Sequence, residues 1–319
     1  MRSLLVAALF LAASDTPAFE LPARLARLLE DGQWDATPAS FRIIVLSHVA
    51  DGCVGQSRAH PELLADAVSC VKATLRRAKA LPKSVDGLHL SHLNLIYGAV
   101  DQLGPCADPQ EHARISGELA RRSLADPLRH AASYEGVGLR WPADQTVTLA
   151  SLARYDATHG AGLLQKPLEE WRGVMAKHLD AKTGLPMSEL TGKGPGAKHP
   201  RGCAQSFITR YLKESDPKLA ATWWAAYREH FLVRIGAVVG FREWPRGVER
   251  KGDVDSGPII LGIGTAASAF GIAAAKAQGD VVLAGQFEAS ASAVMMTGVG
   301  GEMAQGVLAQ AISFQGRWQ

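Results

Sequence analysis

The chain has 319 residues, of which 47% are hydrophobic and 20% are charged, a balance typical of a globular protein with one large domain or two ordinary ones. Its 34 Lys and Arg residues against 31 Asp and Glu residues give a net charge of +3, and the basic residues are dispersed along the chain. This composition excludes a disordered or collagen-like protein and argues against a surface that binds nucleic acid.

Residues 1–18 have the pattern of a secretory signal peptide. Arg2 precedes an apolar stretch from Leu4 to Ala13, and small residues follow. An apolar stretch of about ten residues is too short to span a bilayer, which needs about 20. A buried N-terminal helix is the alternative. We therefore expect a single mature domain at residues 19–319, no membrane span, and a periplasmic or secreted protein.

Export would expose the four cysteines, Cys53, Cys70, Cys106 and Cys203, to an oxidising compartment. Four cysteines can form two disulfides in any of three pairings, and the sequence does not choose among them. Cys53 and Cys203 each follow a glycine near the expected start of a segment. A helix N-terminus there would lower the pKa of the thiol and make it reactive, but in an exported protein we expect a disulfide instead.

Apolar residues recur at intervals of three and four along most of the chain, which predicts helices. The first two are expected around Leu25–Leu29 and Phe41–His48. The others are expected at Pro61–Pro82, Leu88–Leu103, Pro109–Leu124, Ala143–Tyr155, Pro167–Leu179, Cys203–Leu212, Lys218–Val233, Pro258–Ala277, Asp280–Met296 and Glu302–Phe314. Short strands are expected only near Val137–Arg140 and Val238–Phe241.

Twelve helices joined mostly by short loops predict an all-α fold, specifically an (α/α)6 toroid of six helical hairpins. The helix expected from Pro258 is rich in Ala and Gly, as an inner helix at a crowded axis would be. An open helical solenoid is the alternative, although no repeat of fixed period supports it. The pocket of a toroid lies at one end of the inner helices. Polar residues at the starts of helices are therefore the candidates for a functional site.

The segment 241–258 is the densest cluster of polar and aromatic residues. It contains Phe241, Arg242, Glu243, Trp244, Arg246, Asp253 and Asp255. In an extended segment, Asp253 and Asp255 would lie on one side, where an arginine could pair with them. A carboxyl group kept protonated by burial can give a proton while an ionised one takes a proton, so the cluster suits acid/base catalysis. A loop held by salt bridges is the alternative.

Asp144 opens a predicted helix directly after Trp141, where it could act chemically or only complement the helix dipole. The long Gly- and Pro-rich loop that ends before Cys203 contains Arg201, and it could be a lid over a pocket or a solvated loop.

His89 and His92 share one helical face at a spacing that can bind zinc. The sequence shows no third ligand at a spacing typical of a zinc site. We therefore expect no metal ion, and we expect His92 to form part of a polar pocket wall or to be structural.

Several of these segments together resemble the linalool dehydratase/isomerase-like family. The resemblance covers roughly residues 85 to 295 and rests on Trp141-Pro142-Ala143-Asp144, Gly184-Leu185-Pro186, Pro200-Arg201-Gly202, Phe241-Arg242-Glu243-Trp244-Pro245 and Asp253-Val254-Asp255-Ser256-Gly257-Pro258. It implies an (α/α)6 barrel that is frequently exported. It also implies cofactor-free acid/base chemistry on an isoprenoid alcohol, around an apolar cavity with acidic residues, a histidine and cysteines.

We expect Asp144 and Asp255 to form the acid/base pair, assisted by Asp253, Glu243 and His92. Arg242 and Arg246 are expected to orient the carboxylates. Substrate contacts are expected from Trp141, Arg201, Phe241, Arg242, Trp244 and Arg246, with the aromatic faces turned to a developing positive charge. The reaction would be that of a lyase or isomerase on an apolar alcohol.

This hypothesis implies a small-molecule substrate. We expect no cofactor and no nucleic-acid partner, and a homo-oligomer is possible. Two alternatives differ in class. One is a carbohydrate-active enzyme on the same toroid, either a glycoside hydrolase or an epimerase, in which the acids would flank a glycosidic bond. The other is a non-catalytic exported helical scaffold.

Overall fold

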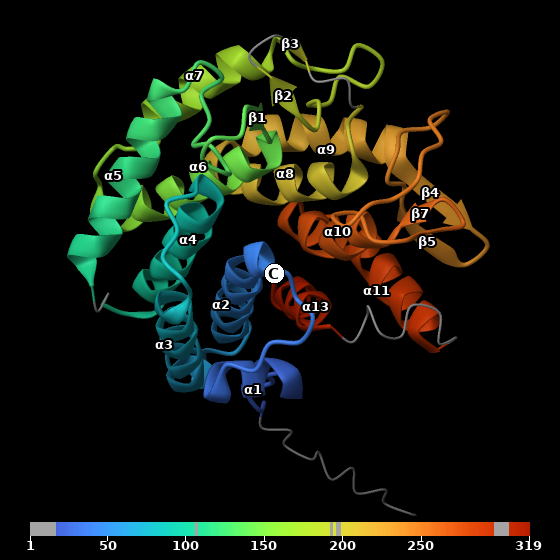
Figure 1. The fold of residues 1–319 in the computed structure, drawn as a ribbon. Coiled ribbons are helices and arrows are strands. Elements are labelled where there is room, and N and C mark those ends of the chain that lie inside the picture. The colour runs from blue at the N-terminus through green and yellow to red at the C-terminus, as the bar shows by residue number, and fades with distance from the viewer. Residues whose placement is uncertain (1–16, 106–107, 192–193, 196–198, 297–305) are drawn as a thin grey trace, which may run out of the picture.

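The computed structural model describes residues 17–105, 108–191, 194–195, 199–296 and 306–319, which are mostly helical (Figure 1). The expected all-α class is confirmed for this part of the chain. Its α-helices are α1 (Ala23–Asp31), α2 (Arg42–Ala59), α3 (Leu64–Ala80), α4 (Gly87–Leu103), α5 (Pro109–Ala125), α6 (Pro142–His159), α7 (Gln165–Met175), α8 (Gly202–Ser215), α9 (Pro217–Phe231), α10 (Thr265–Ala277), α11 (Val281–Met296) and α13 (Val307–Trp318).

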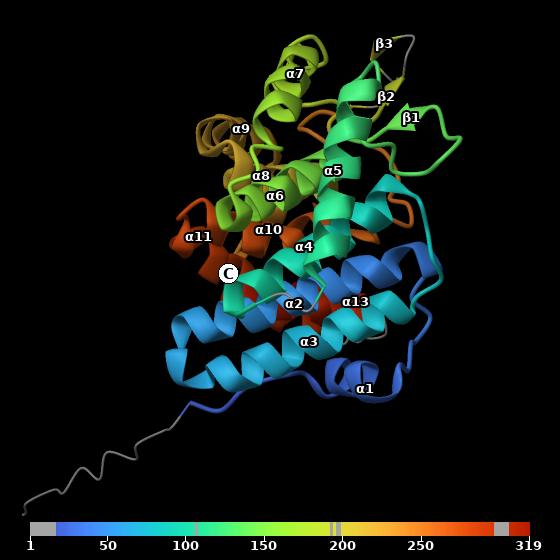
Figure 2. The same ribbon diagram turned by 90° about the vertical axis from the view of Figure 1, so that its left-hand side faces the viewer.

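Six of these helices contact one another in a cyclic order. Helix α2 contacts α4, α4 contacts α6, α6 contacts α8, α8 contacts α10, α10 contacts α13, and α13 contacts α2. Figure 1 shows these six around the middle of the molecule, with α1, α3, α5, α7, α9 and α11 outside them. Figure 2 shows from the side how α3 and α1 cover α2 and α13. A helix covered on several sides must be buried all round, as α2 and α4 are.

Outside this set, α1, α3, α5, α7 and α9 are amphipathic, and two of them begin with clear capping signals. Asp108 accepts a hydrogen bond from the amide of Glu111, directly before Pro109 opens α5. Asp216 and Pro217 open α9 in the same way. A side-chain oxygen satisfies an otherwise free amide, and a proline in the first turn sacrifices no hydrogen bond. These signals lie in the sequence, which is why both helix starts were predicted closely.

Glycines allow α2 and α13 to approach closely. A Cβ at Gly55 would lie 2.0 Å from the carbonyl oxygen of Trp318, and a Cβ at Gly52 would lie 2.4 Å from the ring of Phe314. Any larger residue at either position would push the two helices apart, so this contact between distant parts of the chain depends on the two glycines.

The helix expected from Pro258 begins later, at Thr265. The preceding residues form an antiparallel hairpin, β6 (Ile259–Ile260) and β7 (Ile263–Gly264). Leu261 and Gly262 form its turn with φ angles of 52° and 78°, the left-handed values that a two-residue hairpin turn of this type requires. The sequence-based prediction was therefore wrong for this stretch, although α10 itself is rich in Ala.

Two further small sheets lie in the described residues. They comprise β1 (Leu139–Arg140), β2 (Leu190–Thr191) and β3 (Gly194–Pro195) in one sheet, and β4 (Leu232–Ile235) and β5 (Val238–Phe241) in the other. The strands predicted near 137–140 and 238–241 are confirmed. None of the described helices is long and apolar enough to cross a bilayer. Residues 1–16 of the expected signal peptide lie outside the described residues.

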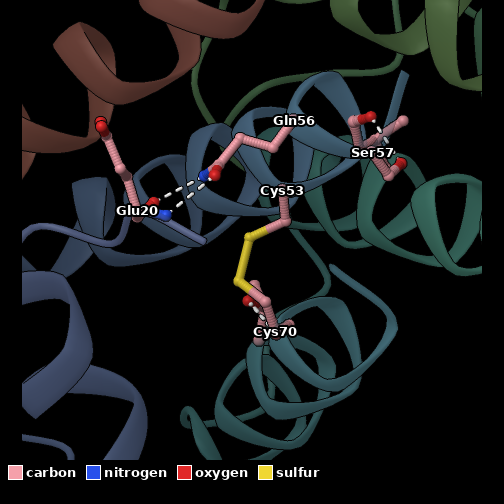
Figure 3. The surroundings of a disulfide bond; sticks show 7 residues. Glu20, Cys53, Gln56, Ser57 and Cys70 are labelled. Carbon is pink, nitrogen blue, oxygen red and sulfur yellow. Dashed lines mark hydrogen bonds between the residues drawn. A yellow bond between two sulfur atoms is a disulfide. The ribbon is translucent and has the colours of Figure 1, made fainter. Parts of the chain in front are cut away.

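One disulfide joins Cys53 of α2 to Cys70 of α3 (Figure 3). The disulfide that we expected at Cys53 is therefore confirmed. Cys203 is free, and Cys106 lies outside the described residues. One turn further along α2, Gln56 exchanges two hydrogen bonds with the backbone of Glu20, as Figure 3 shows. Helix α2 is thus held both to α3 and to the start of the described chain.

Replacing Cys53 and Cys70 together with Ser is expected to lower the free energy of unfolding by about 3 kcal/mol. The bridge spans 17 residues, and a cross-link over a loop of about that length restricts the unfolded chain by this amount. Urea denaturation with and without a reductant measures the effect. The double variant should be insensitive to the reductant, and wild type should fall to the level of the variant. Equal unfolding midpoints without the reductant would contradict this prediction.

Candidate functional site

Arg201 lies at the centre of a group of charged side chains. Its Nε is 2.7 Å from Oε1 of Glu243, its Nη2 is 2.6 Å from Oδ1 of Asp253, and its Nη1 is 3.9 Å from Oδ2 of Asp255. The Arg201 and Glu243 side chains are 7% and 0% exposed, whereas those of Asp253 and Asp255 are 48% and 55% exposed. The group therefore runs from the protein interior to its surface.

A backbone contact explains why Arg201 and Glu243 meet. Strand β5 leads directly to Glu243, whose carbonyl oxygen accepts a hydrogen bond of 2.8 Å from the amide of Gly202. A Cβ at Gly202 would lie 2.0 Å from the carbonyl oxygen of Arg242. Only glycine therefore lets the start of α8 approach the end of β5 so closely.

Cys203, in the first turn of α8, also binds the Glu243 carboxyl group. Its amide donates to Oε2 at 3.1 Å and its thiol donates to Oε1 at 3.2 Å. Burial raises the pKa of the Cys203 thiol well above its usual value, and the charge of Glu243 adds to this rise. The lowered thiol pKa considered for a helix N-terminus is therefore not found at Cys203, and the disulfide that we expected there is not formed. Burial also raises the pKa of Glu243, against the opposing effect of Arg201.

Asp253 and Asp255 lie in a turn rather than in the extended segment expected. Oδ1 of Asp253 accepts hydrogen bonds from the amides of Asp255 and Ser256, both at 3.1 Å. These bonds hold both carboxylates near Arg201. Burial acts to raise the pKa of Asp253, but the hydrogen bond from Arg201 and those from the turn outweigh it and lower the pKa. Asp253 is therefore ionised at neutral pH.

Asp144, in the first turn of α6, is close enough to Asp255 for their charges to interact. Burial raises the pKa of Asp144 to about 6, a hydrogen bond with Ser133 opposes the rise, and the Asp255 charge adds to it. The pKa of the Tyr134 phenol is also raised, first by burial and then by the charges of Asp144 and Asp255. Three titratable groups from separate parts of the chain thus share one electrostatic environment.

The two expected tryptophans contact this group. The Arg201 guanidinium carbon lies 5.3 Å from the ring centroid of Trp244, within the range of a cation–π contact. The ring of Trp141 packs edge-on against Tyr134, with 5.7 Å between ring centroids.

Phe241 does not line the site. It is fully buried in the hydrophobic core, where it stacks on Tyr227 with 4.0 Å between ring centroids. The expectation that Phe241 faces a substrate is therefore corrected: its ring packs against aromatic rings of α9 and α11.

We expected Arg242 and Arg246 to orient the carboxylates, but the structure places both guanidinium groups elsewhere. Arg246 is exposed, and its Nη2 donates to the carbonyl oxygen of Leu232 at 2.9 Å. The Arg242 guanidinium lies beside Gly262 in the β6–β7 turn. Arg201 pairs with Glu243 and Asp253 instead. Its position directly before α8 directs its guanidinium toward these carboxylates.

His92 is buried on α4. Its Nδ1 is 2.7 Å from Oγ of Ser47 on α2, and its ring is 6.3 Å from that of Phe207 on α8. Burial lowers the pKa of His92 well below its usual value, and the imidazoles of His48 and His89 add to this effect. The side chain is therefore neutral at neutral pH and joins three of the central helices.

Sequence reasoning missed three contributors to the site: Ser133, Tyr134 and Cys203 as the partner of Glu243. Ser133 and Tyr134 lie in an irregular loop with no motif of their own. Their position a few residues before Trp141 is the one signal that could have drawn attention to them. Cys203 directly follows the motif that contains Arg201, but its pairing depends on the contact of α8 with β5.

A cavity of about 470 Å³ lies at the other ends of α6 and α8, where it is lined by Arg154, Arg210 and Glu214, among others. Arg154 lies 2.6 Å from both Asp51 and Glu214, and Arg210 lies 2.7 Å from Glu214. These ion pairs tie α2, α6 and α8 together. Because the two arginines are already paired with carboxylates, we interpret this end as structural.

Comparisons with known proteins add no assignment: no family model matches the chain, and no curated protein matches it.

Replacing Arg201 with Met is expected to lower the free energy of unfolding by about 3–5 kcal/mol, because Glu243 would keep a buried charge without its cation. Asp253→Asn should cost less than about 1 kcal/mol, since Asp253 is half exposed. Urea denaturation at pH 7 measures both. The double variant Arg201→Met/Glu243→Gln is the control and should recover most of the loss. An equal loss in the double variant would contradict a charge effect.

Proposed function

We propose that the helices form an (α/α)6 toroid, with α2, α4, α6, α8, α10 and α13 as the inner helices of six hairpins. The cyclic order of their contacts supports this arrangement, since each inner helix of a toroid packs against two inner neighbours. Asp144 and Arg201 lie at the starts of two neighbouring inner helices. The polar group then lies at the N-terminal end of the ring, where a toroid has its pocket.

We propose that the chain is a cofactor-free acid/base enzyme of the lyase/isomerase type. One observation carries this proposal: Asp144 has a pKa of about 6 and interacts with Asp255, which lies beside Arg201. A carboxyl group with a pKa near the working pH transfers protons efficiently. Two carboxyl groups in different environments can divide the acid and base roles.

In this mechanism, protonated Asp144 gives its proton to the hydroxyl group of an alcohol. The C–O bond breaks with both electrons going to oxygen, and water leaves. Ionised Asp255 takes a proton from the neighbouring carbon, and the electrons of that C–H bond form the new double bond. Arg201 acts as a positioning residue that is itself held against the Trp244 ring, and the ring face of Trp141 favours the developing positive charge. One proton is given and one is taken, so Asp144 ends the turnover ionised and Asp255 ends it protonated, and proton exchange with solvent restores both before the next turnover.

The substrate that we propose is an apolar alcohol such as an isoprenoid, and the protein would act after export. The resemblance of several motifs to the linalool dehydratase/isomerase-like family supports this choice of substrate, and the N-terminal signal-peptide pattern supports export. The Cys53–Cys70 disulfide is in keeping with an oxidising compartment.

A second candidate is a carbohydrate-active enzyme on the same toroid. The exposure of Asp253 and Asp255, about half in each case, favours it, because sugar sites are open and hydrated. In that reading the same acids would flank a glycosidic bond.

The test supplies the protein with two panels of substrates, tertiary allylic alcohols and aryl glycosides or oligosaccharides, and follows products by chromatography. We expect turnover of the alcohols, with kcat/KM lowered about 10²–10⁴-fold in Asp144→Asn and in Asp255→Asn. Because Asp144 must carry its proton, the wild-type kcat/KM should fall as the pH rises through about 6. Asp66→Asn, on the exposed side of α3, is the matched control and should be unchanged.

Full activity in both acid variants would overturn the proposal. Cleavage of glycosides without turnover of alcohols would favour the second candidate. Turnover of neither panel, together with a large loss of stability in both acid variants, would identify the group as part of a structural scaffold.

A further inference from the structure

Two histidines and an aspartate from three helices meet at a place remote from the acid pair. We propose that Asp101, His112 and His159 form a binding site for a divalent transition metal ion of the Zn²⁺ class. Asp101 lies near the end of α4, His112 in the first turns of α5, and His159 is the last residue of α6. The site is independent of the proposed function.

The ligand atoms lie close together. Oδ2 of Asp101 is 3.0 Å from Nδ1 of His112 and 2.8 Å from Nε2 of His159, and one ligand atom from each residue lies within 4.8 Å of the others. Metal–ligand bonds of about 2.0 Å in a tetrahedron put ligand atoms about 3.3 Å apart. Small side-chain rotations would therefore admit an ion among these three atoms.

His112 is fully buried and lacks the hydrogen bonds that a buried imidazole normally has. Neither of its ring nitrogens has a hydrogen-bond partner among the described residues. Its Nδ1 faces Oδ2 of Asp101 at an ion-pair distance of 3.0 Å, whereas no hydrogen bond satisfies its Nε2. Buried polar atoms are almost always paired, so this side chain points to a missing partner.

Aromatic rings fix the orientation of both histidines. Tyr97 stacks on His112 with 5.2 Å between ring centroids and an angle of 16° between the rings. Tyr155 lies edge-on to His112 at 4.8 Å and packs against His159 at 4.5 Å. Rings held in this way lose little freedom when they bind an ion, which favours binding.

The charge and exposure of the group also suit a cation. The Asp101 side chain is 3% exposed, and its ion pairs in the described part of the chain are with the two histidines rather than with Lys or Arg. A buried carboxylate needs a compensating charge. The His159 side chain is 30% exposed, so water could fill the fourth position. Imidazole nitrogens with one carboxylate suit zinc better than magnesium or calcium.

This site cannot take part directly in chemistry at Asp144. Asp144 lies in the first turn of α6 and His159 at its end, which puts them about 22 Å apart at 1.5 Å per residue. A bound ion would instead clamp α4, α5 and α6 together.

The test strips the full chain with EDTA, alkylates its free thiols to exclude cysteine ligands, and titrates Zn²⁺ against a chromophoric chelator. We expect saturation at one ion per chain and a rise in Tm with added Zn²⁺. His159→Gln and Asp101→Asn should each weaken binding at least about 100-fold. His60→Gln is the matched control, because its side chain is 37% exposed, and it should bind as wild type does.

Circular dichroism of the metal-free proteins shows whether His159→Gln and Asp101→Asn fold. If one of them does not, the other still tests the proposal. Co²⁺ should give the visible absorption of a tetrahedral site in wild type and lose it in His159→Gln. Absence of saturable Zn²⁺ binding in wild type, or equal affinity in wild type and in the folded ligand variants, would overturn the proposal.

Discussion

Burial of the Arg201 guanidinium is the constraint on which the candidate site depends. A charge removed from water must be compensated nearby, and here the compensation comes from Glu243 in the interior and Asp253 at the surface. The pairing fixes the start of α8 relative to the end of β5 and to the turn that carries Asp255. The same turn places Asp255 where its charge acts on Asp144, at the start of α6.

The two ends of the central helices carry different kinds of polar groups. At the helix starts, carboxyl groups with displaced pKa values meet aromatic rings and a half-exposed surface. At the helix ends, Arg154 and Arg210 are each paired with carboxylates, and the histidine cluster joins α4, α5 and α6. We interpret the first end as the place of chemistry and the second as the place that holds the helices together, with the proposed metal ion as a further link.

The sequence predicted most of the fold because helix signals are local. Apolar spacing, prolines in first turns and caps such as Asp108 depend only on near neighbours, and they gave the helices closely. The start of α10 was missed for a similar reason: Ile259 to Gly264 reads as part of a small-residue helix, whereas Leu261 and Gly262 adopt a turn. The candidate site was predicted as a region, from the density of polar residues. Its pairings could not be predicted, since the choice of Arg201 over Arg242, the Cys53–Cys70 bridge and the meeting of Asp101 with two histidines are all set by tertiary contacts.

The central claim is that Asp144 and Asp255 share one environment. The most direct measurement is an NMR titration of the Asp144 carboxyl carbon in wild type and in Asp255→Asn. The account predicts a pKa near 6 in wild type and a lower value in the variant, because removal of the Asp255 charge makes ionisation of Asp144 easier. A pKa near the ordinary value of about 3.9 for Asp144 in both proteins would contradict it.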